Sequence, residues 1–149
     1  DWDSVMAVNL KSIFLTSKFT IPVMKKTGGA IINIASVHAF ASYNKYAAYA
    51  ASKGAVVSLS RQMALDHTAD GIRVNSVVVG GVNTDMSIGL ALAGGATMDN
   101  LGFIEDPKVV GRTGHPTEIA AGITFLASPD ASFIVGSPFW IDGGLTADL

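Results

Sequence analysis

The feature that most constrains the fold is a pair of short segments rich in isoleucine and valine. Residues 30–35 are apolar except for Asn33, and residues 72–79 form a second such run. A strand with one face in water alternates apolar and polar residues, whereas a strand covered on both faces is apolar almost throughout. Both segments are therefore predicted to be buried strands of a parallel sheet.

Helical segments separate these strands, as a parallel sheet requires. Residues 4–26 are predicted to form a helix with two apolar faces, and residues 45–69 a second long helix rich in alanine. A third helix is predicted from Pro116 to about Ala127, before a last strand at Phe139–Ile141. Alternation of helices and strands implies right-handed crossovers, and 149 residues suffice for a single domain.

Composition excludes several classes of function. The chain has no cysteine, and His38, His67 and His115 stand far apart, so we expect no disulfide and no metal site; the histidines are expected in loops or at helix ends. A net charge of −2 with scattered basic residues argues against nucleic-acid binding. No apolar run is long enough to span a membrane, so we expect a cytoplasmic protein.

A tyrosine and a lysine four positions apart supply the clearest candidate chemistry. Tyr49 and Lys53 share a face of the second predicted helix, about one turn apart. A phenol has an unperturbed pKa of about 10, and a neighbouring cation favours the phenolate. Such a pair can move a proton onto or off a substrate oxygen, although the same spacing also occurs on ordinary helix surfaces.

Two further polar residues stand where they would complete such a site. Ser36 lies thirteen positions before Tyr49 and just past the first strand, at the end where open α/β sheets bind ligands. It either donates to a substrate oxygen or merely ends the strand. Asn9, on an apolar helix face, must find a hydrogen bond. It is either a structural peg or part of a site that relays protons to Lys53 through water.

The segment between residues 82 and 111 has no firm periodicity. It contains the pair Gly94-Gly95 and several large apolar side chains, and it follows the carboxyl end of a strand. We expect residues of about 85–111 to form a lid over an apolar pocket, the alternative being a plain surface loop.

Taken in order, these segments resemble the carboxyl-terminal part of a short-chain dehydrogenase/reductase, a Rossmann-type family of nicotinamide-dependent oxidoreductases. The resemblance covers nearly the whole chain and implies an α/β fold with a doubly wound parallel sheet in one domain, residues 1–149. It rests on Val8-Asn9-Leu10, Asn33-Ile34-Ala35-Ser36, Tyr49–Lys53, Arg73-Val74-Asn75 with Gly80 and Thr84, Arg112-Thr113-Gly114-His115-Pro116 and Asp142-Gly143-Gly144.

The resemblance also implies a role for each site residue. Tyr49 would be the general acid/base, Lys53 would tune it and bind the nicotinamide ribose, and Ser36 would position the substrate oxygen. Asn9 would complete the proton relay. The cofactor-binding set would be Tyr49, Lys53, Gly80, Val82 and Thr84.

Cofactor, substrate and assembly are likewise expectations drawn from the resemblance. The cofactor would be NAD or NADP, and the substrate a small secondary alcohol or its ketone, of the sugar, polyol or 3-hydroxyacyl type. The first two helices resemble the family's dimer interface, and the segment Phe139–Leu149 commonly joins a second one, which implies a homodimer or homotetramer.

The sequence departs from the family pattern at two points. Val79 stands where a proline commonly precedes Gly80, and no glycine-rich phosphate-binding turn occurs anywhere in the chain. We therefore expect a Rossmann fold that is incomplete, without its amino-terminal phosphate-binding half. Residues 1–149 alone are expected to be marginally stable and inactive. The alternatives to an oxidoreductase are a non-catalytic Rossmann-like binding or assembly protein and an inactive fragment.

Overall fold

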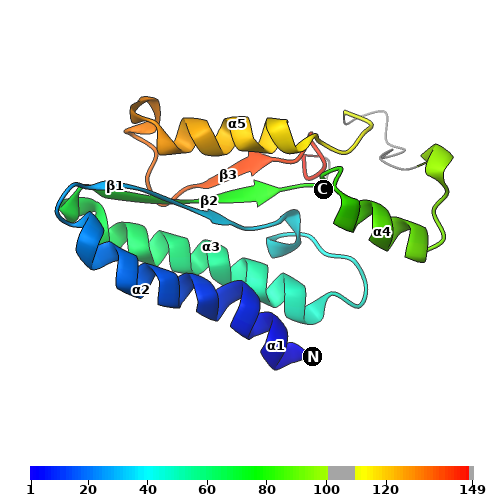
Figure 1. Cartoon of the computed structure of the whole chain (residues 1–149), viewed down its shortest axis with the longest axis horizontal. Coiled ribbons are helices and arrows are strands. Elements are labelled where there is room, and N and C mark those ends of the chain that lie inside the picture. Colours follow the sequence, from blue (N-terminus) through cyan, green and yellow to red (C-terminus); the bar gives the residue numbers. More distant parts are fainter. Residues whose placement is uncertain (101–109, 148–149) are drawn as a thin grey trace.

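Three strands form one parallel sheet in the computed structural model, which describes residues 1–100 and 110–147 (Figure 1). The strands β1 (Gly29–Ile34), β2 (Ile72–Val79) and β3 (Pro138–Ile141) lie side by side in that order. Ile31 lies opposite Val74 in the register. The predicted parallel sheet is confirmed.

Helices cover both faces of this sheet (Figure 1). On one face lie α1 (Trp2–Met6), the π-helical turn η1 (Ala7–Lys11), α2 (Ser12–Met24) and α3 (Ala47–His67). On the other lies α5 (Pro116–Ala127), so the sheet is doubly wound and Rossmann-like. The remaining elements are the short 3₁₀ turns η2 (Val37–Ala39), η3 (Thr68–Asp70), η4 (Met98–Asn100) and η5 (Pro129–Ala131) and the helix α4 (Asp85–Ala93).

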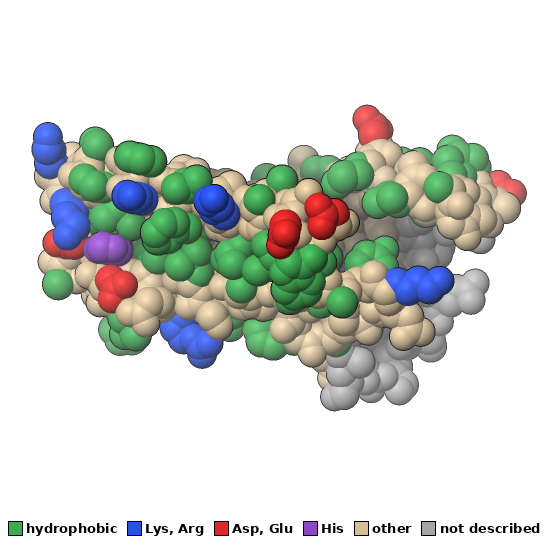
Figure 2. Space-filling model, turned by 90° about the horizontal axis from the view of Figure 1, so that it is seen from below, with side chains coloured by type: hydrophobic (Ala, Val, Ile, Leu, Met, Phe, Trp, Pro, Cys, Tyr) green, Lys and Arg blue, Asp and Glu red, His purple; other side chains and the backbone are tan. Residues whose placement is uncertain are grey.

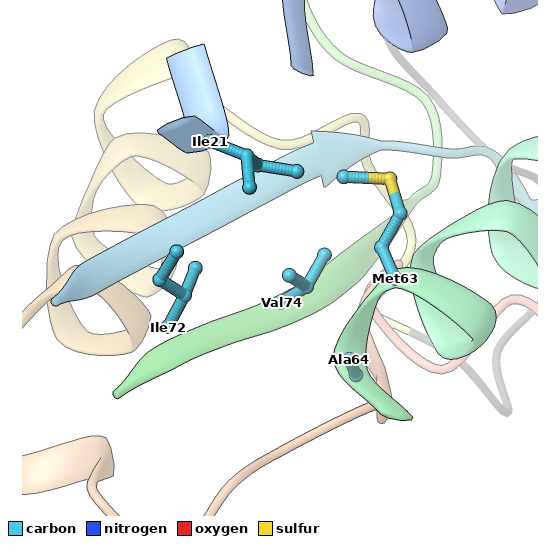
Figure 3. Close-up of a cluster of buried hydrophobic side chains, with 5 residues drawn as sticks. All are labelled: Ile21, Met63, Ala64, Ile72 and Val74. Carbon is cyan, nitrogen blue, oxygen red and sulfur yellow. The ribbon is translucent and has the colours of Figure 1, made fainter. Parts of the chain in front are cut away.

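The core is built where helix side chains meet the central strand. In one cluster Ile21 of α2 and Met63 of α3 pack onto Ile72 and Val74 of β2, together with Ala64 (Figure 3). A second cluster on the opposite face joins residues of β2, α5 and η5: Val77, Leu126 and Ala131. Because each fully buried aliphatic side chain contributes about 1.5–3 kcal/mol, β2 is the strand that fixes both helix layers.

Two elements differ from the expected pattern. The first helix contains a π-helical turn, η1, which includes Asn9. The segment between residues 82 and 111, whose sequence has no firm periodicity, is helical over Asp85–Ala93. There the Thr84 side chain accepts a hydrogen bond from the backbone N–H of Ser87 at 3.2 Å and starts the helix. The expected lid also includes residues 101–109, which lie outside the described residues.

None of the described helices is both long and apolar enough to cross a membrane.

Candidate functional site

Ser36 lies where β1 gives way to the turn η2, at the carboxyl end of the sheet. The strand ends at Ile34, and Ser36 is the extended residue that caps η2. The side chain is buried, and its Oγ accepts a hydrogen bond from the backbone N–H of His38 at 3.3 Å. Since a hydroxyl has one proton and two lone pairs, this contact leaves the Ser36 proton for another acceptor.

Lys53 connects helix α3 to the same strand end. Its Nζ donates to the backbone carbonyl of Ile34 at 2.9 Å and lies 5.6 Å from the ring centroid of Tyr49. Burial lowers the pKa of Lys53 below its usual range. The ammonium group is therefore fixed between the end of β1 and the Tyr49 ring rather than extended into solvent.

Asn9 reaches the Tyr49–Lys53 turn through another residue, Ser52. The Asn9 side-chain amide donates to Ser52 Oγ at 3.1 Å, and Ser52 Oγ donates to the backbone carbonyl of Tyr49 at 2.7 Å. Ser52 is fully buried. The amide therefore ties η1 to the helical turn that carries the phenol and the ammonium.

Sequence reasoning missed Ser52, although a signal was present. It is a hydroxyl in an alanine-rich stretch of helix, directly before Lys53. A serine inside a helix often bonds to a backbone carbonyl one turn earlier, as Ser52 does.

His38 lies closer to the site than its predicted place in a loop suggested. Its ring centroid is 5.4 Å from that of Tyr49 and 4.9 Å from that of Tyr46. Its Nδ1 lies 3.1 Å from Ser42 Oγ. Tyr43 also packs against this ring, at 5.4 Å, so His38 contacts the rings of three tyrosines. Burial lowers the pKa of His38.

The predicted cofactor residues Gly80, Val82 and Thr84 follow the end of β2, beside the strand that leads to Ser36. A Cβ at Gly80 would lie 2.8 Å from Asp142 Cα, so glycine is needed there for the close approach of the chain after β3. Val82 forms a β-bridge with Gly114. The backbone after β2 is thus fixed by its contacts with Asp142 and Gly114.

Thr84 is largely occupied by helix capping. The Thr84 hydroxyl accepts a hydrogen bond from the backbone N–H of Ser87 and lies 3.2 Å from Ser87 Oγ. The backbone N–H of Thr84 donates to Ser87 Oγ at 2.9 Å. Asp85 follows directly in the first turn of α4. Local structure therefore explains this threonine without a ligand.

The structure thus brings Asn9, Ser36, Tyr49 and Lys53 to one end of the sheet through a chain of contacts. Gly80, Val82 and Thr84 lie at the end of the neighbouring strand, and within the described part of the chain no hydrogen bond or ring contact joins them to the four. Among the described residues, the Tyr49 hydroxyl has no hydrogen-bond partner, so the phenol is available to a ligand.

Comparison with known proteins gives the family. The family model described as "Enoyl-(Acyl carrier protein) reductase" matches residues 1–146. The chain belongs to the short-chain dehydrogenase/reductase family. Among curated relatives it is 42% identical to meso-2,3-butanediol dehydrogenase of Serratia marcescens, over 99% of this chain and 56% of that protein.

Solved structures of dehydrogenases are also similar to this chain. Aldohexose dehydrogenase of Thermoplasma acidophilum superposes with a TM-score of 0.89 at 34% identity, over 98% of this chain and 59% of the other. A 4-hydroxyisoleucine dehydrogenase solved with NADH gives 0.79 at 34% identity, over 98% and 60%. The chain therefore spans somewhat more than half the length of the relatives that it matches.

Proposed function

We propose that this chain carries the proton-transfer site of an NAD- or NADP-dependent oxidoreductase that interconverts a secondary alcohol and a ketone. One observation carries the proposal. The Lys53 ammonium is held by the carbonyl of Ile34 at 2.9 Å and lies 5.6 Å from the Tyr49 ring, at the strand end that leads to Ser36. This combination places a proton donor, a cation and a hydroxyl at the end of the sheet where such folds bind ligands.

In the reduction direction, a hydride adds to the carbonyl carbon and the Tyr49 phenol gives its proton to the carbonyl oxygen. The Ser36 hydroxyl donates a hydrogen bond to the same oxygen, because the His38 N–H occupies one of its lone pairs and leaves its proton for the substrate. The Lys53 ammonium stabilises the phenolate that remains. Oxidation of the alcohol runs the same steps backwards.

Asn9 acts on this site indirectly, through Ser52. Its amide donates to Ser52, which in turn donates to the Tyr49 carbonyl. We assign Asn9 to positioning this helical turn and, through its side-chain carbonyl, which has no hydrogen-bond partner among the described residues, to holding a water on the proton path to Lys53.

The residues present fit a nicotinamide cofactor, which supplies or accepts the hydride when it is bound. An ammonium group has three N–H donors, and the Ile34 carbonyl takes one of them. The other two are available to ribose hydroxyls, as is the Tyr49 hydroxyl. Gly80, Val82 and Thr84 would lie along the nicotinamide end, although the backbone N–H groups of Gly80 and Thr84 already donate to Ile141 and Ser87. The solved 4-hydroxyisoleucine dehydrogenase with NADH supports this choice of cofactor.

The substrate that these groups suit is a small secondary alcohol or ketone of the sugar, polyol or 3-hydroxyacyl type. Two similar proteins are named for such alcohols, meso-2,3-butanediol and an aldohexose. Helix α4 exposes Met86 and Leu90 beside the end of β2. We assign the described part of the segment of about 85–111, which includes α4, to a lid that closes over the substrate.

We further propose that the protein acts in the cytoplasm as a homodimer or homotetramer. A groove of about 660 Å³ runs between the first helices and α3. Phe14, which lines it, is 52% exposed, and apolar side chains are spread over this face beside a row of basic ones (Figure 2). Large exposed apolar surfaces of this kind mark protein interfaces.

Substitution of the phenol separates this proposal from a non-catalytic binding protein or an inactive fragment. Tyr49→Phe in the full-length native protein removes the proton donor and keeps the ring, so kcat should fall by about 10²–10⁴-fold. NADH or NADPH binding should weaken far less than kcat falls, because only the one hydrogen bond from the phenol to the ribose is lost. The matched control is Tyr46→Phe, which alters a neighbouring ring of the same cluster and should retain most of the turnover. Unchanged turnover in Tyr49→Phe would discredit the assigned role.

A further inference from the structure

His38 lies against the proposed proton donor, yet the proposed reaction does not use its side chain. Its ring meets that of Tyr49 edge to face at 5.4 Å. Its backbone N–H donates to Ser36 Oγ at 3.3 Å. A carbonyl held between Ser36 and Tyr49 would therefore have the His38 ring beside its substituents.

One nitrogen of this ring is already engaged. Nδ1 lies 3.1 Å from Ser42 Oγ, and the Ser42 hydroxyl donates to the backbone carbonyl of Tyr43 at 3.5 Å. A neutral imidazole carries one N–H and one lone pair, so Nε2 of the neutral ring can either donate or accept one hydrogen bond. Among the described residues, Nε2 has no hydrogen-bond partner. Burial lowers the pKa of His38 and favours this neutral ring.

The same ring also lines a small cavity. His38 lines a cavity of about 130 Å³ between η2 and the segment that follows β3. A cavity of roughly 150 Å³ accommodates benzene, so this one suits a short group rather than a long chain. Its other lining residues are Val37, Ala41, Ser42, Tyr43, Leu145 and Thr146.

We propose that His38 is a specificity-determining residue whose Nε2 forms a hydrogen bond with a second substrate hydroxyl, on the carbon next to the reacting one. The inference rests on the proposed function and narrows the substrate class to vicinal diols and the matching α-hydroxyketones. A hydroxyl can both donate and accept, so it can pair with Nε2, whereas a simple ketone leaves Nε2 without a partner.

The test compares 3-hydroxy-2-butanone with 2-butanone, which differ by the hydroxyl in question. Both are reduced by the full-length native protein with NADH and with NADPH, and the ratio of their kcat/KM values is measured. His38→Leu should lower this ratio about tenfold, the effect expected for one uncharged hydrogen bond. His38→Gln, which keeps an acceptor, should restore part of the ratio. The control His67→Leu changes a histidine that pairs with Asp70 and should leave the ratio unchanged.

The outcomes separate this inference from the proposed function. A purely structural role for His38 would lower turnover of both ketones together and keep their ratio, and that result overturns the inference. Reduction of both ketones by the unaltered protein without any preference would also overturn it while the proposed function stands. An unaltered protein that reduces no ketone with either cofactor would overturn both.

Discussion

Two asparagine–serine pairs connect helix α3 to its neighbours, and they differ in how close they lie to the proposed reaction. Asn9 donates to Ser52 at 3.1 Å, and Asn33 of β1 donates to Ser60 at 2.9 Å. The Ser52 hydroxyl donates a hydrogen bond to the backbone carbonyl of Tyr49, and the Ser60 hydroxyl donates one to the backbone carbonyl of Val56. Ser60 lies eight residues beyond Ser52, about 12 Å along the helix. The pairs therefore provide a matched comparison between structural support and support of catalysis.

We predict that Ser52→Ala and Ser60→Ala separate these two effects. Each leaves an asparagine amide without its acceptor, which costs about 1–3 kcal/mol, the larger value for Ser60 because Asn33 is buried. Only Ser52→Ala should lower kcat, by about tenfold or more, because it frees the turn that carries Tyr49. Urea unfolding gives the stabilities, and initial rates give kcat. Equal losses of kcat in both variants would show that Ser52 acts only through stability.

At this scale the sequence predicts residue types better than their contacts. Tyr49 and Lys53 were identified from their spacing because a helix places residues four apart on one face. The contact of Lys53 with the Ile34 carbonyl, and the place of His38 beside Tyr49, depend on how α3 and η2 pack against each other. No periodicity in either segment contains that information.

Among the elements, α5 has the most clearly defined start. Pro116 is its first residue, and Glu118 in the first turn accepts the backbone N–H of His115 at 2.7 Å. The Arg112 guanidinium donates two hydrogen bonds of 2.8 Å to the same carboxylate. Hydrogen bonds from Arg112 and then from the His115 backbone lower the pKa of Glu118 from its usual value to about 2.

This ion pair predicts a stability difference that depends on pH. Because the pKa of Glu118 is lower in the folded chain, the pair stabilises the fold above pH ~4.5 and is lost as pH falls towards about 2. The Tm of the unaltered protein should exceed that of Glu118→Gln at pH 7. This difference in Tm should disappear as the pH falls from ~4.5 to about 2. The Tm of Arg112→Gln should likewise lie below that of the unaltered protein at pH 7, and the difference should disappear over the same pH range. A difference that persists at pH 2 would contradict the assignment.

Element boundaries were predictable where local chemistry marks them. The strand at residues 72–79 and the helix from Pro116 to Ala127 were found in the sequence because glycine, proline and buried β-branched residues define their ends. Helix α4 was missed because Gly89 interrupts its apolar side chains, most of which are exposed rather than gathered on one buried face. The π-helical turn at Asn9 has no sequence signature, and it depends on how η1 packs against α3.

At the scale of the whole molecule, the surface that carries α1, α2 and α3 is unusual for its apolar content. The groove between them is lined by Met6, Leu10, Phe14, Ala55 and Leu59 among others, and Figure 2 shows apolar side chains across the same face. The alanines of α3 predicted close helix approach, but a single chain leaves this groove unfilled. A second copy of the chain, packed across this groove, would cover it with helices of the same kind.

We predict that Phe14→Glu breaks this assembly. A carboxylate buried without a partner costs about 3–5 kcal/mol, so dimer dissociation should become at least about 100-fold easier. Light scattering coupled to size-exclusion chromatography should show the molar mass halved at a concentration where the unaltered protein is associated. Phe133→Glu is the matched control, because Phe133 is fully exposed in the loop before β3 and lies outside the groove. Both variants should keep the far-ultraviolet circular dichroism of the folded protein. An unchanged mass for Phe14→Glu would place the subunit contact elsewhere, whereas equal dissociation in both variants would point to a general effect of added charge.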